Sequence, residues 1–255
     1  MKSIGRIFTL LLFTLLIFGC DQISNPLSPE TSELSNSLSG QPLPSLAKEA
    51  NYGGVLASIG YEVKINENLP STSISMGFAQ IGKLVDAGTV SVNNSELNKI
   101  NKDGKIFYLS PGPENITGLS NVNFDGSQHT WNITGNDSVA SFTGSITSPT
   151  SFNLTAPENN STINKEDGIE VTWSGTSTDS KILIIVLSEN TDIKPYVKEN
   201  LPDNGAFTIS ASDLEKLSGK VYLQVAKYKY TTQNSNGKNY LLISEIVKLK
   251  TLTLD

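Results

Sequence analysis

The chain has 255 residues, a formal net charge of −6 and a single arginine, Arg6. An acidic chain with so little arginine lacks the bidentate guanidinium contacts that read phosphate and guanine, which argues against nucleic-acid binding. Frequent turn residues and few helix-favouring stretches predict an all-β sandwich or barrel, and the length accommodates two domains of about 100 residues.

The N-terminus carries one short apolar segment that ends at the only cysteine of the chain. Lys2 and Arg6 precede a 12-residue, almost wholly apolar stretch at 7–18, and Gly19 stands directly before Cys20. This stretch has the length of a signal-peptide core and is too short to cross a bilayer as a helix. We expect export and removal of residues 1–19, and a secretory signal with a chance cysteine is the alternative.

The residues Ile17, Gly19 and Cys20 resemble the lipobox of bacterial lipoproteins. The resemblance implies that Cys20 is lipidated and that acyl chains such as palmitate hold the protein to a bacterial membrane. It places the protein in the cell envelope, with the outer membrane or cell surface favoured. Asp21 leaves the inner membrane open, because an aspartate after the lipidated cysteine resembles an inner-membrane retention signal. Beyond Cys20 no thiol remains to form an intramolecular disulfide.

Residues 20–47 are expected to be the lipidated cysteine and a flexible tether. Residues 21–46 contain four prolines and seven serines but no aromatic side chain. Such a segment buries too little apolar surface to offset the entropy lost on ordering.

Residues 48–150 are predicted to form a first β-sandwich module. Apolar and polar residues alternate at 55–65 and at 74–78, the pattern of strands with one buried face. Further strands are expected at 89–92, 105–109, 130–133 and 139–146.

Residues 151–255 are predicted to form a second module, with strands at 152–154, 169–173, 182–187, 207–209, 221–225 and 240–254. Six consecutive apolar residues at 182–187 indicate a central strand that is covered on both faces. Ser212 and Glu215 fit the capping box of one helical turn. Asn236–Gly237 predicts the tip of a long hairpin.

The second module resembles the immunoglobulin-like and fibronectin type III-like modules of bacterial envelope proteins. The residues that carry the resemblance are 157–160, Val171–Thr172–Trp173–Ser174, Phe207–Thr208–Ile209, Leu214, Leu217, Gly219 and 221–225. It implies that Trp173 packs between two sheets. An Asp–Gly pair precedes both Trp131 and Trp173 by a similar spacing, which favours two related modules with one core tryptophan each.

The search for catalytic and metal-binding residues yields no site. His129 is the only histidine and is expected on the exposed face of a strand, no Gly-x-Ser-x-Gly motif occurs, and no pair of carboxylates stands out for glycoside hydrolysis. One histidine and one lipidated cysteine cannot make a zinc site. Residues 101–104 and 121–125 hold possible calcium ligands, but turns explain them better. We therefore expect a non-catalytic protein without a cofactor or bound metal.

Tyr222, Tyr228 and Tyr230 are the candidate ligand-binding residues, because they share one parity in the strand pattern and aromatic rings stack on sugars. That register places Lys227 and Lys229 on the core face. A β-bulge near Ala226 would remove this conflict and make Tyr228 and Tyr230 core residues, and it is the favoured interpretation.

The sequence thus predicts a membrane-anchored lipoprotein that serves envelope structure or binds surface proteins. A carbohydrate-binding protein that uses the tyrosines is the alternative.

Overall fold

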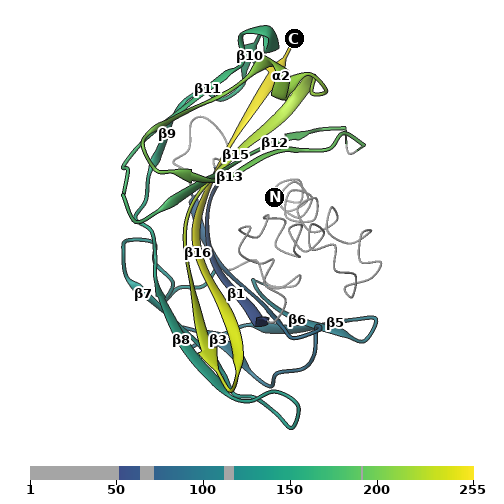
Figure 1. Cartoon of the computed structure of the whole chain (residues 1–255), viewed down its shortest axis with the longest axis vertical. Helices are drawn as coiled ribbons and strands as arrows, with labels where there is room; N and C mark the ends of the chain where they lie inside the picture. The colour runs from purple at the N-terminus through teal and green to yellow at the C-terminus, as the bar shows by residue number, and fades with distance from the viewer. Residues whose placement is uncertain (1–51, 64–71, 112–117, 191) are drawn as a thin grey trace, which may run out of the picture. The chain divides into compact units, whose positions relative to one another are not determined.

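The computed structural model describes residues 52–63, 72–111, 118–190 and 192–255 (Figure 1). The expected signal peptide, the lipidation site at Cys20 and the tether lie outside the described residues. Within these ranges nearly all secondary structure is β-strand, which confirms the all-β prediction. None of the helices in the described ranges is both long and apolar enough to cross a bilayer.

The largest element of the described chain is a nine-stranded sheet, called the long sheet below. Its strands follow the order β13-β12-β15-β16-β1-β2-β6-β5, and β10 adds to β16 in parallel. These strands are β1 (Tyr52–Val63), β2 (Thr72–Ile81), β5 (Asn98–Lys102), β6 (Lys105–Ser110), β10 (Ser161–Ile163), β12 (Lys181–Ser188), β13 (Tyr196–Pro202), β15 (Gly219–Ser235) and β16 (Lys238–Leu254). As the sequence predicts, β12 is central, between β13 and β15.

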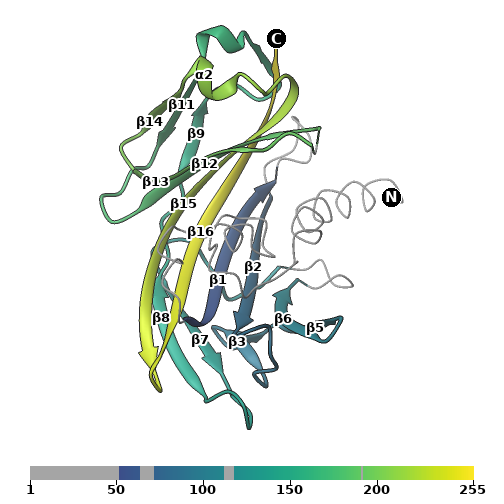
Figure 2. The ribbon, with the colours of Figure 1, turned by 45° about the vertical axis from the view of Figure 1, so that its right-hand side comes forward.

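The hairpin of β15 and β16 is the longest feature of the sheet, with 17 residues in each strand. The strands pair from Gly219 opposite Leu254 to Ser235 opposite Lys238 without a shift of register, and Figure 2 shows them side by side along their length. Asn236 and Gly237 close the hairpin with φ angles of 50° and 73°. Two positive φ angles are the geometry of a type I′ turn, which confirms the predicted tip.

Two smaller sheets complete the described structure. One has the order β4-β3-β7-β8 and the other the order β14-β11-β9. Their strands are β3 (Val90–Val92), β4 (Ser95–Glu96), β7 (Gln128–Ile133), β8 (Phe142–Thr147), β9 (Asn153–Ala156), β11 (Ile169–Ser174) and β14 (Ala206–Ile209).

Each small sheet packs against part of the long sheet over its own apolar core. Trp131 of β7 lies in the first core with Leu56 and Leu242 of the long sheet. Trp173 of β11 lies in the second core with Ile184 of β12 and other residues of the long sheet. The two indoles are 0% and 4% exposed, which confirms the prediction that both tryptophans are core residues.

The division between the cores falls close to the boundary expected at residue 150, but the long sheet crosses it. The first core draws on residues up to Ile146 and also on Tyr240 and Leu242, whereas the second begins at Phe152. Because β16 lies beside β1, strands from both sides of residue 150 belong to one sheet. Residues 53–255 form one compact unit.

The short helix α2 (Ala211–Leu214) is present, but its cap differs from the expected one. Ser210, not Ser212, is the N-cap, and its side chain accepts a hydrogen bond from the backbone N–H of Asp213. The cap thus lies two residues earlier than the Ser–x–x–Glu pattern indicates.

Candidate functional site

The face of the long sheet opposite the two cores, called the back face below, is the most unusual surface of the described structure. Side chains alternate along a strand, so Val221, Leu223 and Val225 of β15 enter a core while their neighbours point the other way. The buried apolar residues on the back face belong to neither core; they are Ala57, Ile59, Tyr61, Phe78, Leu109, Leu183, Ile185, Ala226, Tyr228, Leu241, Ile243 and Val247.

The three candidate tyrosines lie on this face. Tyr228 is only 2% exposed, and its hydroxyl accepts a 3.1 Å hydrogen bond from the backbone N–H of Asn200. Its ring stacks on Tyr230 with 6.1 Å between centroids. Tyr222 is half-buried, and the Lys220 ammonium lies 5.4 Å from its ring centroid. The structure therefore brings Tyr228 and Tyr230 together and leaves Tyr222 apart.

The predicted bulge near Ala226 is wrong. β15 pairs with β12 and with β16 in unbroken register through this position. Tyr228 is buried even though it points to the back face, and Lys227 stays on the core side.

Lys227 is accommodated there by a buried ion pair. Its ammonium lies 3.1 Å from Asp203 Oδ2 and donates a 2.6 Å hydrogen bond to the carbonyl of Gly175, and both charged side chains are fully buried. The Trp173 indole N–H and the backbone N–H of Ser177 donate to the two carboxylate oxygens of Asp203 at 2.6 and 2.8 Å. Each charge thus has an opposite charge and hydrogen bonds, which a buried pair requires.

Two buried polar side chains on the back face escape sequence reasoning. Gln224 is 1% exposed, and neither its Oε1 nor its Nε2 has a hydrogen-bond partner within the described structure. Its cross-strand neighbours are Ile185 and Leu249. Glu245, opposite Tyr228, is 5% exposed, and burial raises the pKa of its carboxyl to about 8. One sequence feature could have identified both residues: each is polar, but the residues two positions before and after it on the same face of the strand are apolar or aromatic.

His129 is buried, so the prediction of an exposed histidine is wrong. Residues two apart on a strand share a face, and His129 therefore points inward with Trp131 on β7. Its Nδ1 lies 2.7 Å from Ser58 Oγ and 3.2 Å from Ser244 Oγ, and its Nε2 lies 2.8 Å from the carbonyl oxygen of Asn123. Burial lowers the pKa of His129. Both ring nitrogens thus have partners that tie β1, β7 and β16 together.

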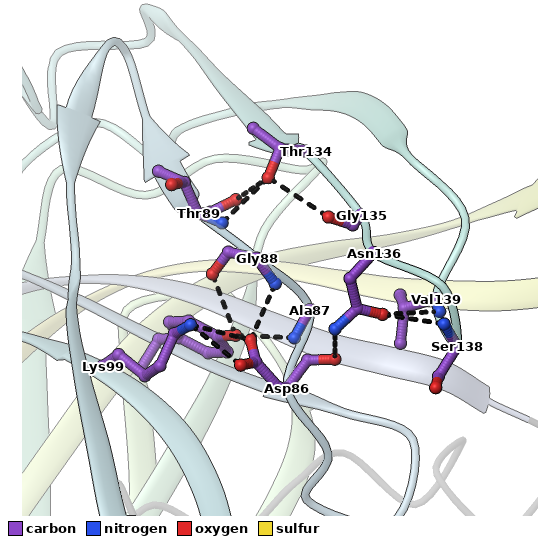
Figure 3. Close-up of polar contacts among 11 residues, drawn as sticks. Asp86, Ala87, Gly88, Thr89, Lys99, Thr134, Gly135, Asn136, Ser138 and Val139 are labelled. Atoms are coloured by element: carbon purple, nitrogen blue, oxygen red, sulfur yellow. Dashed lines mark hydrogen bonds and ion pairs between the residues drawn. The ribbon is translucent and has the colours of Figure 1, made fainter.

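A surface network around Asp86 and Asn136 joins two loops of the first core (Figure 3). The Asp86 carboxylate accepts hydrogen bonds from the Gly88 N–H and the Lys99 ammonium. Asn136 donates to the Asp86 carbonyl and accepts from the N–H groups of Ser138 and Val139. These polar groups bond to one another, which indicates a structural cross-link.

The close approach of the two loops gives a testable requirement for glycine. Gly88 and Gly104 share a φ of +77°, but a Cβ on Gly88 would overlap the Gly135 carbonyl oxygen, whereas a Cβ on Gly104 meets nothing within 4 Å. We expect Gly88→Ala to lower the free energy of unfolding by about 1–3 kcal/mol more than Gly104→Ala, measured by denaturant titration. Equal losses would show that the loops are not held as described.

In the two turns considered as calcium sites, side-chain oxygens accept hydrogen bonds from backbone N–H groups of the same turn. The side chain of Asn101 accepts a hydrogen bond from the Gly104 N–H, and that of Asp125 accepts one from the Ser127 N–H. No cluster of three or more metal-ligating side chains (His, Cys, Asp or Glu) occurs within the described ranges.

Comparison with known proteins gives no relative: no protein family and no curated protein matches the sequence.

Proposed function

We propose that this chain is a lipid-anchored protein of the bacterial cell envelope that works by binding rather than by catalysis. It would present two β-sandwich modules that share the long sheet, the second of immunoglobulin-like or fibronectin type III-like type, to envelope or surface proteins. The observation that carries the proposal is the position of Cys20, the only cysteine, directly after an apolar stretch of signal-peptide length. The packing of Trp173 within the second core is compatible with the module type.

Loss of the thiol tests the anchor. In a C-terminally tagged chain, Cys20→Ala should abolish incorporation of radiolabelled palmitate and release the protein from the membrane fraction, because the acyl chains provide the attachment. Ser28→Ala, in the same segment, is the matched control and should stay with the membrane. A Cys20→Ala chain that remains membrane-bound would refute the proposal.

Protease treatment of intact cells then separates two roles. Digestion of the tagged chain without lysis would favour adhesion or another interaction at the cell surface. Protection until lysis would favour a role in envelope structure.

Carbohydrate binding is the second candidate function. The stacked rings of Tyr228 and Tyr230 favour it, since aromatic faces contact sugar rings. Tyr228 is buried and Tyr222 lies apart from the pair, so the ring of Tyr230 would have to supply the contact. Binding of the anchored protein to a glycan array that is lost in Tyr230→Ala would select this candidate.

A further inference from the structure

One end of the long sheet, called the basic end below, carries lysines from neighbouring strands. Lys238 is the first residue of β16, and a Cβ on Gly53 of β1 would come within 2.8 Å of the Lys238 Cβ. Lys83 follows β2 in a turn whose first residue, Gly82, donates a hydrogen bond to the Gly53 carbonyl. β1 therefore starts between two lysines, and the chain that leads back to Cys20 leaves the sheet at this end.

The hairpin of β5 and β6 brings two more lysines to the same end. Lys105 begins β6 and lies opposite Lys102, the last residue of β5, and Asp103 between them is the one acidic residue of this hairpin. β6 runs antiparallel to β2, and the Ile106 N–H donates to the carbonyl of Leu84 in the turn after β2. Figure 2 shows the β5–β6 hairpin, the start of β1 and the tip of the β15–β16 hairpin toward the lower end of the long sheet.

Ion pairs do not cancel the positive charge of the basic end. None of Lys83, Lys105 and Lys238 forms an ion pair within the described ranges. The carboxylate of Asp86, three residues after Lys83, lies 2.8 Å from the Lys99 ammonium, so these two charges offset each other. The basic end therefore keeps an excess of positive charge, in a chain whose formal net charge is −6.

An exposed apolar side chain lies in the same turn as Lys83. Val85 is 38% exposed, and Val197 of β13 is the other large apolar side chain that is exposed within the described ranges. Lysines around an exposed apolar residue suit a membrane surface with anionic lipids, because the ammonium groups approach the phosphates and the apolar side chain enters the interface. The chemistry of the basic end thus fits an anionic lipid surface.

We propose that the basic end docks on the membrane that holds the anchor, where its lysines contact anionic phospholipid head groups and Val85 enters the interface. The inference rests on the lipid anchor of the proposed function, since attachment through Cys20 raises the effective concentration of the membrane surface at this end. The opposite end of the long sheet, where Gly219 pairs with Leu254, then points away from the bilayer. Docking therefore leaves the second module accessible to partners.

Fluorescence quenching in proteoliposomes tests the docking. In the processed full chain the thiol of Cys20 is acylated, so Val85→Cys introduces the only free thiol and carries the fluorophore. The vesicles contain a lipid with a quencher in its head group, in phosphatidylcholine with or without phosphatidylglycerol. We expect quenching to be roughly fivefold stronger with phosphatidylglycerol and to fall in high salt, which screens the lysines.

The second exposed valine gives the matched control position. Val197 lies on β13, between Tyr196 and Leu201, and both of these pack against the second core. A fluorophore on Val197→Cys should therefore show no quenching in either vesicle. Equal quenching at the two positions, or quenching at Val85 that does not depend on phosphatidylglycerol, would overturn the proposal.

Two double variants test the lysines themselves. Lys83→Gln with Lys238→Gln removes two exposed charges of the basic end and should reduce the quenching at Val85 at least fivefold. Lys194→Gln with Lys216→Gln removes two exposed charges beside residues of the second core and should leave the quenching unchanged. Equal effects of the two double variants would contradict the docking, and thermal unfolding checks that both are native.

The anchor and the docking fail separately. A lipidated chain whose fluorophore at Val85 shows no quenching would refute the docking and leave the anchor intact. A chain without acyl chains would refute the anchor, and its fluorophore is then read with an excess of vesicles added to the soluble protein. Quenching there that requires phosphatidylglycerol would support the docking, and its absence would overturn it.

Discussion

Asp203→Ala is expected to lower the free energy of unfolding by about 3–5 kcal/mol, because it leaves the Lys227 ammonium without its counter-ion inside the second core. The loss has a second source: the Trp173 indole N–H and the Ser177 N–H would lose their acceptor. Denaturant unfolding followed by tryptophan fluorescence measures the change, and Trp173 reports directly on the site.

An exposed ion pair provides the control. Lys220 and Glu189 lie 3.2 Å apart with 47% and 62% of their side chains exposed, so Glu189→Ala should cost no more than about 1 kcal/mol. Lys227→Met combined with Asp203→Leu should recover part of the loss, since apolar replacement of a whole buried pair is often tolerated. A change below 1 kcal/mol in Asp203→Ala would mean that the pair is not buried as described.

This ion pair also shows where prediction from the sequence stops. Strand alternation correctly places Lys227 on the core side, but a lysine there looks like an error of register until its partner is known. Asp203 lies 24 residues away along the chain and across the sheet interface, and no local pattern links the two. The wrong prediction of a bulge near Ala226 arises because the sequence gives no sign of a partner for Lys227.

The prediction that His129 is exposed is wrong for a related reason. His129 lies two residues from Trp131 on the same strand, so its side chain should point inward as that of Trp131 does. The polarity of histidine suggests the opposite, and the prediction followed the polarity. The groups that make burial tolerable, Ser58 and Ser244, come from strands 71 and 115 residues away. Local periodicity gives the strands, the turn at Asn236–Gly237 and the core tryptophans, whereas pairing between distant strands, such as β16 with β1, is set by packing across the whole sheet.

The back face could be predicted in part. Residues 182–187 are all apolar, so both faces of this strand are apolar, which indicates a strand covered on both faces. Residues 240–247 are apolar or aromatic except for Ser244 and Glu245. The unusual feature is the pair of polar residues, Gln224 and Glu245, within these strands. No residue of the described ranges pairs with the Gln224 amide, and burial raises the pKa of Glu245. Both are properties of the three-dimensional neighbourhood and have no counterpart in sequence periodicity.

Glu245→Gln is expected to stabilise the protein at neutral and alkaline pH. Burial raises the pKa of this carboxyl from 4.5 to about 8, so between these values the unfolded chain is ionised while the folded chain keeps its proton. Ionisation then favours the unfolded state, and the stability of the native protein falls as the pH rises through this window. Glutamine removes the effect, with a gain of up to roughly 5 kcal/mol above pH 8, since the shift from 4.5 to about 8 corresponds to about 1.4 kcal/mol per pKa unit.

The difference between the two stability curves isolates Glu245, because His129 contributes equally to both. The comparison is needed because the effect of His129 on stability runs in the opposite direction with pH. Burial lowers the pKa of His129, so its contribution is present above the unfolded value near 6.5 and is lost as the pH falls. Glu170→Gln, at an exposed position of β11, should follow the wild-type curve throughout. We expect the Glu245→Gln and wild-type curves to coincide below pH 4.5 and to separate steadily up to pH 8. Parallel curves across this range would show that the Glu245 carboxyl is hydrated or paired, and that the back face is open to water at this position.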